Sequence, residues 1–210
     1  MSIENIFQAV IGLNADQVVS EVKTELAAGT DVNAILNDGL IKAMDFVGER
    51  FSAGETFVPE MLMSAHAMKT GVEILKPHLT GDAQKKVGTI VIGTVDGDLH
   101  DIGKNLVCIM LEGAGFNVVD LGVDVKKETF VEMAKEHNAD IIGLSTLLTT
   151  TMCMVEDTIT AIKEAGIRDS VKILVGGAPL SREYADTIGA DAFAADAGSA
   201  GKVARDLVLH

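Results

Sequence analysis

The chain has 210 residues, 48% of them apolar, which is enough for one large domain or two modest domains with hydrophobic cores. Its 17 basic and 31 acidic side chains give a formal net charge of −14, so it should repel nucleic-acid phosphates and anionic lipids, and we expect no nucleic-acid or membrane partner. No run approaches about 18 apolar residues, and the first residues lack the basic start and apolar stretch of a secretory signal, so we expect a cytoplasmic protein.

Residues 1–77 show the apolar spacing of three or four residues that is typical of helices, and they contain no convincing strand. Asn14 and Asp31 are suited to cap two helices. Pro59 stands near the start of a later helix, where its missing N–H costs nothing. With a short segment at 3–13, this pattern predicts an N-terminal four-helix bundle.

The polar residues 78–87 predict a linker, and after it the rhythm of the sequence changes. Through residues 88–210, helix-like segments alternate with five short runs: VGTIVIGTV, FNVVDLG, ADIIGLSTL, VKILVGG and ADAFAADA. This alternation predicts an α/β domain of the flavodoxin-like or Rossmann-like kind, with a five-stranded parallel sheet. Ligands of such domains bind beyond the carboxyl ends of the strands, so the loop after the first run is a candidate site.

That loop, GTVDGDLHDIGKN at 93–105, places Asp96, Asp98 and Asp101 around a single histidine, His100. Its spacing does not match a Walker loop, because five residues separate its glycines and no Lys-Ser/Thr pair follows. A phospho-accepting receiver domain would need a lysine near the last strand, and the sequence offers none there. A metal site made by protein alone would need three or four converging ligands, and no other histidine is spaced to join His100.

Cys108 and Cys153 form no C-x-x-C pair and are expected to be buried, unreactive thiols, so they add no ligands to His100. Two interpretations of this histidine stay open from the residues alone. In the first, His100 is the one protein ligand of a metal that brings its other ligands with it, as in a tetrapyrrole. Asp98 would then orient the imidazole, and Gly103 would let a bulky group approach the backbone. In the second, His100 is a loop histidine satisfied by Asp98, with no metal.

The stretch DLHDIG at 98–103 matches the D-x-H-x-x-G signature of cobalamin-binding domains. Companion motifs stand after later strands: Ser145 and Leu147 form an S-x-L element, two glycines follow the fourth run, and IGADAFAADA resembles the family's fifth-strand region. The segment GERFSAGETFVPEMLMSAHAM, at 48–68, resembles the helical cap that precedes this domain. Over essentially its whole length, the chain resembles the corrinoid proteins of methyltransferase systems and the cobalamin-binding region of methionine synthase.

The resemblance implies a cobalamin or related cobamide bound base-off, with His100 as the lower axial ligand of cobalt and Asp98 as its hydrogen-bonded orienter. Thr151 resembles the hydroxyl that extends this relay. The displaced nucleotide tail is expected in a slot that Gly176 and Gly177 would keep open, because a side chain there would fill it. The cofactor-binding residues implied are Gly97, Asp98, Leu99, His100, Asp101, Ile102, Gly103, Ser145, Leu147, Thr149, Thr151, Gly176, Gly177, Ala195 and Asp196.

The function implied by the resemblance is methyl carriage through Co(I) and methyl-Co(III), with the bundle acting as a lid over the corrin. The partners would be a substrate:corrinoid methyltransferase, a methylcorrinoid:acceptor methyltransferase using tetrahydrofolate or coenzyme M, and a reductive activation protein. The chain would be non-catalytic by itself, because the cofactor carries the difficult chemistry. The alternatives are a subunit of an adenosylcobalamin mutase, a cobalamin-based sensor, and an acidic α/β binding module without a corrin.

Overall fold

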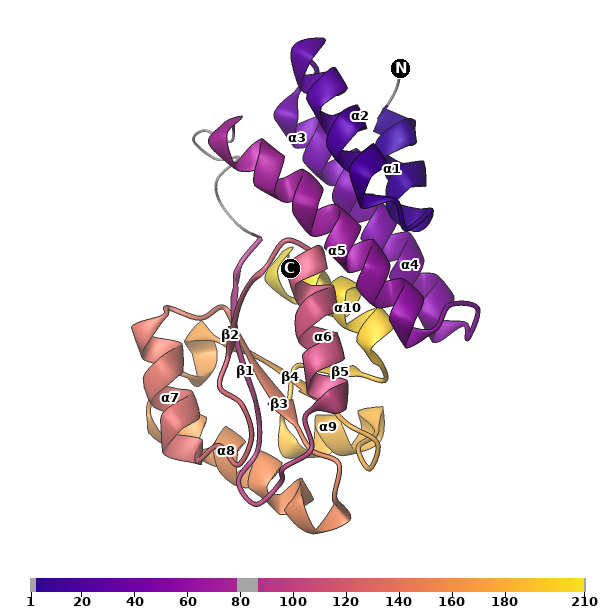
Figure 1. Cartoon of the computed structure of the whole chain (residues 1–210). Coiled ribbons are helices and arrows are strands. Elements are labelled where there is room, and N and C mark those ends of the chain that lie inside the picture. The colour runs from indigo at the N-terminus through magenta and orange to yellow at the C-terminus, as the bar shows by residue number, and fades with distance from the viewer. Residues whose placement is uncertain (1–2, 79–86, 210) are drawn as a thin grey trace. The chain divides into compact units, whose positions relative to one another are not determined.

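The computed structural model describes residues 3–78 and 87–209. The chain forms two compact units, a helical unit within residues 1–86 and an α/β unit within residues 87–210 (Figure 1). The linker predicted at 78–87 falls almost wholly outside the described residues. In residues 3–78 and 87–209, no helix has both the length and the apolar character needed to cross a lipid bilayer.

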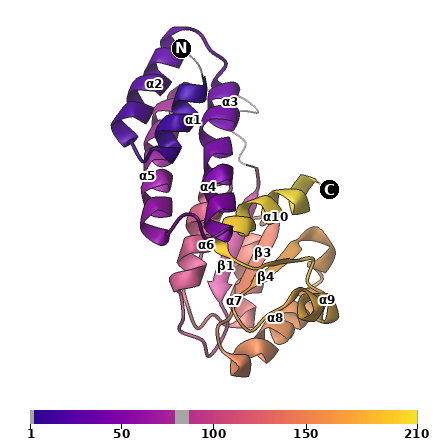
Figure 2. The same ribbon diagram turned by 90° about the vertical axis from the view of Figure 1, so that its right-hand side faces the viewer.

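Figure 2 shows the helical unit as a bundle of helices. It is the predicted four-helix bundle, and its second and third long segments begin at the predicted capping residues. Asn14 Oδ1 accepts from the backbone N–H of Gln17 at 3.0 Å, and Asp31 Oδ1 accepts from that of Asn33 at 3.4 Å, which confirms both predictions. Pro59 lies in the first turn of the last helix, as expected. The helices are α1 (Ile3–Ile11), α2 (Ala15–Ala27), a continuous segment of α3 (Val32–Ala34), the π-helical η1 (Ile35–Ile41) and α4 (Lys42–Ser52), α5 (Val58–Leu75), and the final turn η2 (Lys76–His78).

The α/β unit contains the predicted five-stranded sheet, whose strands are all parallel and lie in the order β2-β1-β3-β4-β5. The strands are β1 (Thr89–Thr94), β2 (Asn117–Asp120), β3 (Ile141–Ser145), β4 (Lys172–Gly176) and β5 (Ala192–Ala194). The connecting helices are α6 (Ile102–Gly113), α7 (Lys127–Glu136), α8 (Met152–Glu164), α9 (Arg182–Ile188) and α10 (Ala197–Leu209), with short 3-10 turns η4 (Thr149–Thr151) and η5 (Arg168–Ser170).

Both faces of this sheet are covered by helices, which explains why its central strands are apolar throughout. Helices α7 and α8 lie on one face and α6 on the other (Figure 1). Val91 and Ile142 belong to the core cluster that includes residues of α7, α8 and α9, while their neighbours Ile90 and Ile141 are equally buried. The alternation of strands with amphipathic helices was therefore a sound basis for the fold prediction.

Parallel pairing aligns the carboxyl ends of four strands in one row. Thr94 of β1 pairs with Ser145 of β3, Ser145 with Gly176 of β4, and Gly176 with Ala194 of β5. In the sheet, β2 lies on one side of β1 and β3 lies on its other side. The strand order therefore reverses between β1 and β3. That is the position at which open α/β sheets bind ligands.

Candidate functional site

Two hydrogen bonds, one to a side chain and one to a backbone carbonyl, hold the loop between β1 and α6 to the neighbouring loop after β2. The Gly97 N–H donates to Asp124 Oδ1 at 2.8 Å, and the Asp124 N–H donates to the Asp98 carbonyl at 3.0 Å. The Thr94 hydroxyl donates to the His100 carbonyl at 2.9 Å and so closes the loop on its own strand. These contacts fix the backbone that carries Asp98 and His100.

Asp98 is completely buried, and both of its carboxylate oxygens accept hydrogen bonds. Oδ1 accepts from the His100 N–H at 3.0 Å and faces His100 Nδ1 at 2.7 Å. Oδ2 accepts from the N–H groups of Leu147 at 2.7 Å and Leu148 at 3.3 Å, just beyond β3. Burial opposes ionisation of this carboxyl, but the bonds from Leu147, His100 and Leu148 outweigh it and hold the pKa of Asp98 well below its usual range.

The ionised carboxylate decides which nitrogen of His100 carries the proton. A carboxylate can only accept, so Nδ1 must be the protonated nitrogen in the neutral ring, and Nε2 keeps its lone pair. The His100 side chain is 50% exposed, whereas that of Asp98 is fully enclosed. The loop thus presents one oriented imidazole to the solvent, and its Nε2 lone pair is available to bind a metal.

Large apolar side chains on the same two segments are exposed instead of buried. Leu99 is 71% exposed and Ile102 is 80% exposed on the β1–α6 loop, and Leu147 and Leu148 are also exposed after β3. An exposed apolar patch next to a polar group marks a ligand or partner surface. A half-exposed imidazole among such side chains suits the face of a large, partly apolar ring.

Comparison with known proteins identifies this arrangement. The B12 binding domain matches residues 88–207, and a second B12 binding domain, the helical one, matches residues 2–76. This chain belongs to the B12-binding family. Its cofactor is accordingly a cobalamin or related corrinoid.

Several relatives of this B12-binding protein are similar over most of their length. Dimethylamine corrinoid protein 1 of Methanosarcina acetivorans is 47% identical over 99% of this chain and 100% of its own, and trimethylamine corrinoid protein 1 of the same organism is 48% identical over 85% and 84%. A cobalamin-binding protein from Desulfitobacterium hafniense has a TM-score of 0.85 at 32% identity, covering 99% of this chain and 98% of the other. The methanol:cobalamin methyltransferase complex MtaBC of Methanosarcina barkeri gives 0.82 at 30% identity, covering 99% and 79%.

In this B12-binding protein the predicted Thr151 does reach the buried carboxylate, and a second hydroxyl reaches it as well. Thr151 Oγ1 lies 3.3 Å from Asp98 Oδ2, and Thr146 Oγ1 lies 3.2 Å from the same oxygen. The two hydroxyl oxygens are 2.7 Å apart. Thr146 was missed because it is the unspecified middle residue of the S-x-L element, and its only sequence signal is strand alternation, which turns it away from Ser145 and Leu147.

Gly176 ends β4 and Gly177 follows it, and both lie close to the backbone of neighbouring segments. A Cβ on Gly177 would lie 1.7 Å from the Thr146 carbonyl oxygen, and Gly177 has φ of +131°. A Cβ on Gly176 would lie 3.2 Å from the Ala194 carbonyl oxygen. Gly177 therefore lets its backbone approach the Thr146 carbonyl closely, and the nucleotide slot that the two glycines would keep open stays a prediction.

The remaining predicted residues lie on the same row of strand ends. Asp101 Oδ2 accepts from Asn105 Nδ2 at 3.1 Å, and Gly103 has open space where a Cβ would stand. Ser145 is half-buried at the end of β3, and Thr149 is exposed in η4. Beyond β5, Ala195 is exposed and Asp196 Oδ1 accepts from the Ser199 N–H at 2.8 Å.

An ion pair next to the site, made by a buried lysine, also escaped prediction. Lys104, in the first turn of α6, is buried, and its Nζ lies 2.6 Å from both carboxylate oxygens of Asp120 at the end of β2. It also donates to Asn105 Oδ1 at 2.8 Å. Because the partner is 16 residues away on another element, no helical spacing could reveal it, yet the pair ties the start of α6 to the sheet edge.

The two cysteines differ from each other in the structure. Cys108 is half-buried, and burial, followed by the charge of Asp120, raises the pKa of its thiol to about 12, which lowers the share of reactive thiolate. Cys153, at the start of α8, is exposed, and the prediction that it is buried was wrong. Among the described residues, no group of three or more His, Cys, Asp or Glu side chains gathers to hold a metal ion.

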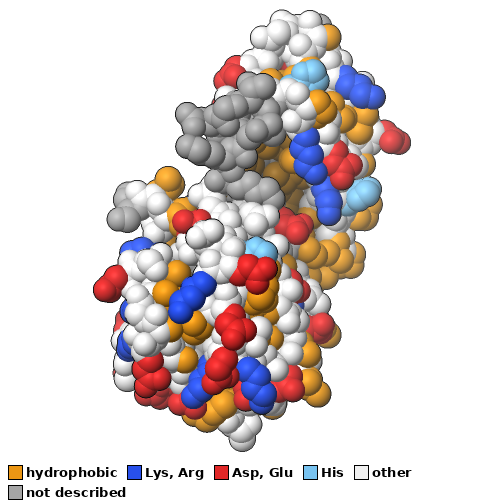
Figure 3. Space-filling model, turned by 90° about the vertical axis from the view of Figure 1, so that its left-hand side faces the viewer, with side chains coloured by type: hydrophobic (Ala, Val, Ile, Leu, Met, Phe, Trp, Pro, Cys, Tyr) orange, Lys and Arg blue, Asp and Glu red, His pale blue; other side chains and the backbone are white. Residues whose placement is uncertain are grey.

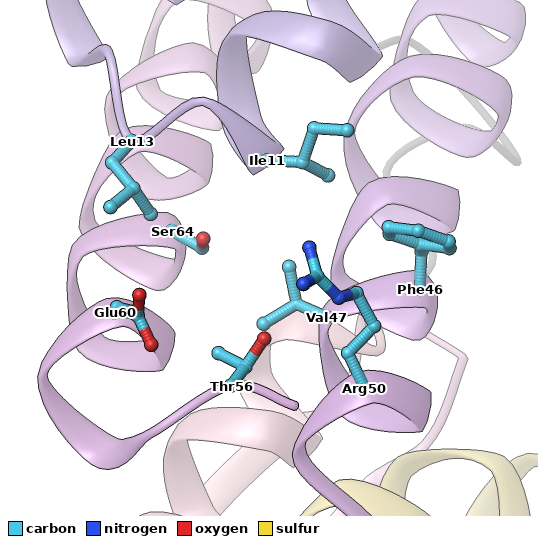
Figure 4. A pocket seen from close by; sticks show the side chains of 8 residues that line it. All are labelled: Ile11, Leu13, Phe46, Val47, Arg50, Thr56, Glu60 and Ser64. Carbon is cyan, nitrogen blue, oxygen red and sulfur yellow. The ribbon is translucent and has the colours of Figure 1, made fainter. Parts of the chain in front are cut away.

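The B12-binding protein has a charged surface over its α/β unit (Figure 3) and a small hollow in its helical unit. On the face shown in Figure 3, acidic side chains lie among Lys and Arg over the α/β unit. The helical unit contains a hollow of about 60 Å³, lined by Ile11, Leu13, Phe46, Val47, Arg50, Thr56, Glu60 and Ser64 (Figure 4). In this hollow Arg50 pairs with Glu55 at 3.3 Å, and Glu60 accepts from the N–H of Phe57, the residue before α5. Its size suits a few water molecules and not a corrin.

Proposed function

We propose that this chain is a corrinoid methyl carrier of a methylamine methyltransferase system, holding its cobamide base-off with His100 as the lower ligand of cobalt. The observation that carries the proposal is the buried Asp98 carboxylate, which orients the half-exposed His100 ring through Nδ1 at 2.7 Å and leaves Nε2 free. When bound, the corrinoid supplies a cobalt centre that can accept and release a methyl group.

The residues of the chain would divide the remaining work. His100 holds the metal, and Asp98 keeps the ring in one tautomer and one orientation and makes its free nitrogen a better ligand. The exposed Leu99, Ile102 and Leu147 provide an apolar platform beside the imidazole. None of these groups is a nucleophile or a general acid placed for a substrate, which supports a carrier that acts with partner enzymes.

The proposed partners are a substrate:corrinoid methyltransferase and a methylcorrinoid:acceptor methyltransferase, with tetrahydrofolate or coenzyme M as the acceptor, together with a reductive activation protein. A methylated amine as donor is supported by the relatives named as dimethylamine and trimethylamine corrinoid proteins. The match of residues 2–76 to a helical B12 binding domain also supports a methyl carrier, since a mutase subunit would need only the α/β domain.

The first test is cofactor loading. Purified protein is mixed with hydroxocobalamin and passed through gel filtration, and its cobalt content and visible spectrum are recorded. The wild type should retain about one cobalt per chain in a histidine-ligated form, and His100→Ala should lose cobalt or show a base-off spectrum. His137→Ala, a histidine at the end of α7, is the matched control and should behave as the wild type. Retention of the same spectrum by His100→Ala would refute His-on binding.

The second test concerns the donor. The loaded, reduced protein is incubated with a dimethylamine:corrinoid methyltransferase and dimethylamine, and methylation of the cofactor is followed in the visible spectrum. Methylation with dimethylamine, and none with methanol and a methanol:corrinoid methyltransferase, is expected. Equal methylation in both systems would contradict an amine-specific carrier while leaving the carrier role intact.

A further inference from the structure

The Oδ2 oxygen of Asp98 has more hydrogen-bond donors around it than a single carboxylate oxygen needs. Two are backbone N–H groups, from Leu147 and Leu148. The other two are the hydroxyls of Thr146 and Thr151, at 3.2 and 3.3 Å. Both threonines are buried, and Thr146 is only 1% exposed. Bulk water therefore does not compete for their hydroxyls.

Counting protons limits what the two hydroxyls can do. At 2.7 Å from each other, Thr146 and Thr151 must share a hydrogen bond, and each has only one proton. One hydroxyl therefore donates to the other, which leaves one proton for the rest of the site. That proton can go to Asp98 Oδ2 or to the Leu148 carbonyl, which lies 3.1 Å from Thr151 Oγ1 and 3.4 Å from Thr146 Oγ1.

We propose that Thr146 is a positioning residue for His100 and that Thr146 and Thr151 form an interchangeable hydroxyl pair, in which either one can donate to Asp98 while the other donates to its partner. This inference rests on the proposed function, because it matters for a cofactor only if His100 is the cobalt ligand. The expected relay runs through Thr151 alone, whereas in this proposal the hydroxyl of either threonine can donate to Asp98.

The two hydroxyls are held in place by separate parts of the fold, so the loss of one leaves the position of the other unchanged. The Thr146 N–H donates to the Gly176 carbonyl at 3.2 Å, and its own carbonyl packs against Gly177. Thr151 closes the turn η4 at the start of α8, with its N–H donating to the Leu148 carbonyl. The glycine segment after β4 is thereby linked through Thr146 to Asp98, and the beginning of α8 is linked to it through Thr151.

The pair makes a distinctive prediction for isosteric substitutions. In Thr151→Val the Thr146 hydroxyl can turn to Asp98, and in Thr146→Val the Thr151 hydroxyl can do so. Each single variant should weaken the binding of cobalamin less than about 3-fold, whereas the double variant should weaken it about 10-fold or more, because the last hydroxyl donor to a buried charge is lost. The effects should thus be non-additive, as expected for residues in one network.

The experiment compares wild type, both single valine variants, the double variant, and Thr146→Ser in the Thr151→Val background. The dissociation constant for hydroxocobalamin and the fraction of histidine-ligated cofactor in the visible spectrum are measured for each. The serine variant keeps the hydroxyl and should match Thr151→Val, which a purely steric role for the threonine would not predict. Urea unfolding of the proteins without cobalamin checks that each variant folds and tests the pair without the cofactor.

Two results would overturn the proposal. If Thr151→Val alone is as impaired as the double variant and Thr146→Val equals the wild type, the relay has a single hydroxyl. If the two single losses simply add, the hydroxyls act independently. Failure of the proposed function looks different: wild type and His100→Ala then bind cobalamin equally poorly, while the midpoints of urea unfolding still report whether the two threonines compensate for each other.

Discussion

Removing the Asp98 carboxylate should destabilise the α/β unit before any cofactor is considered. Asp98→Ala leaves three backbone N–H groups, those of His100, Leu147 and Leu148, without their acceptor. A buried donor left unpaired costs about 1–3 kcal/mol. Because these three residues are partly exposed, water can reach some of the groups, so we take the low end for each and expect a loss of about 2–4 kcal/mol in the free energy of unfolding.

The chain offers a specific probe for this measurement. It contains one tyrosine, Tyr184 in α9, and no tryptophan, so tyrosine fluorescence during urea unfolding at pH 7 reports on the α/β unit alone. Asp96→Ala is the matched control, because Asp96 lies in the same loop, its carboxylate pairs with Lys126 at the surface, and the loss of such a pair should have little measurable effect. A loss below about 1 kcal/mol for Asp98→Ala, or an equal loss for both variants, would refute the reasoning.

The same carboxylate predicts how stability depends on pH. The pKa of Asp98 in the folded protein lies below the value of about 3.9 typical of an unfolded chain, so its contribution is fully present above about pH 5 and is lost as the pH falls below about 4. The difference in unfolding free energy between wild type and Asp98→Asn should therefore be constant from about pH 5 to 8 and shrink below pH 4. A difference that stays constant down to pH 3 would contradict the assigned interactions.

Three further predictions concern the surroundings of the site. Gly177→Ala should lower the free energy of unfolding by about 3 kcal/mol or more, or prevent folding, because its φ is positive and the new Cβ would collide with the Thr146 carbonyl. Tyrosine fluorescence during urea unfolding measures this loss. Lys104→Met should cost about 2–4 kcal/mol by the same assay, below the full value for a buried pair because Asp120 is partly exposed, and a loss near zero would show that the pair is not structural. The native protein should give one equivalent of rapid thiol labelling at pH 8, from the exposed Cys153, and two when unfolded, since the raised pKa of Cys108 keeps it protonated. Two rapid equivalents in the native state would contradict that raised pKa.

The sequence sufficed for the elements whose signals are local. The alternation of apolar runs with helical segments predicted the parallel sheet, and single residues such as Asn14 predicted helix starts, because capping involves neighbours within one turn. The spacing of Asp98 and His100 likewise predicted their contact, which joins residues two apart.

Contacts between distant segments were beyond such reasoning. Thr146 and Leu148 reach Asp98 only because β1 and β3 are paired in one register, and no pattern in the sequence states that register. The packing of Gly177 on Thr146 was beyond prediction in the same way, since a glycine can serve a ligand or a neighbouring backbone and the sequence does not reveal the backbone contact.

The distance in sequence between Asp98 and its partners also bears on how the protein matures. The carboxylate of Asp98 accepts from the N–H of Leu147, 49 residues further along, and the two residues follow the central strands β1 and β3, which pair only after a crossover connection. Parallel pairing of distant segments is slow and comes late, because loop-closure entropy must be overcome first. The bonds that fix the Asp98 carboxylate from the β3 side therefore form only with the central sheet, and loading with the corrinoid is expected to follow closure of that sheet.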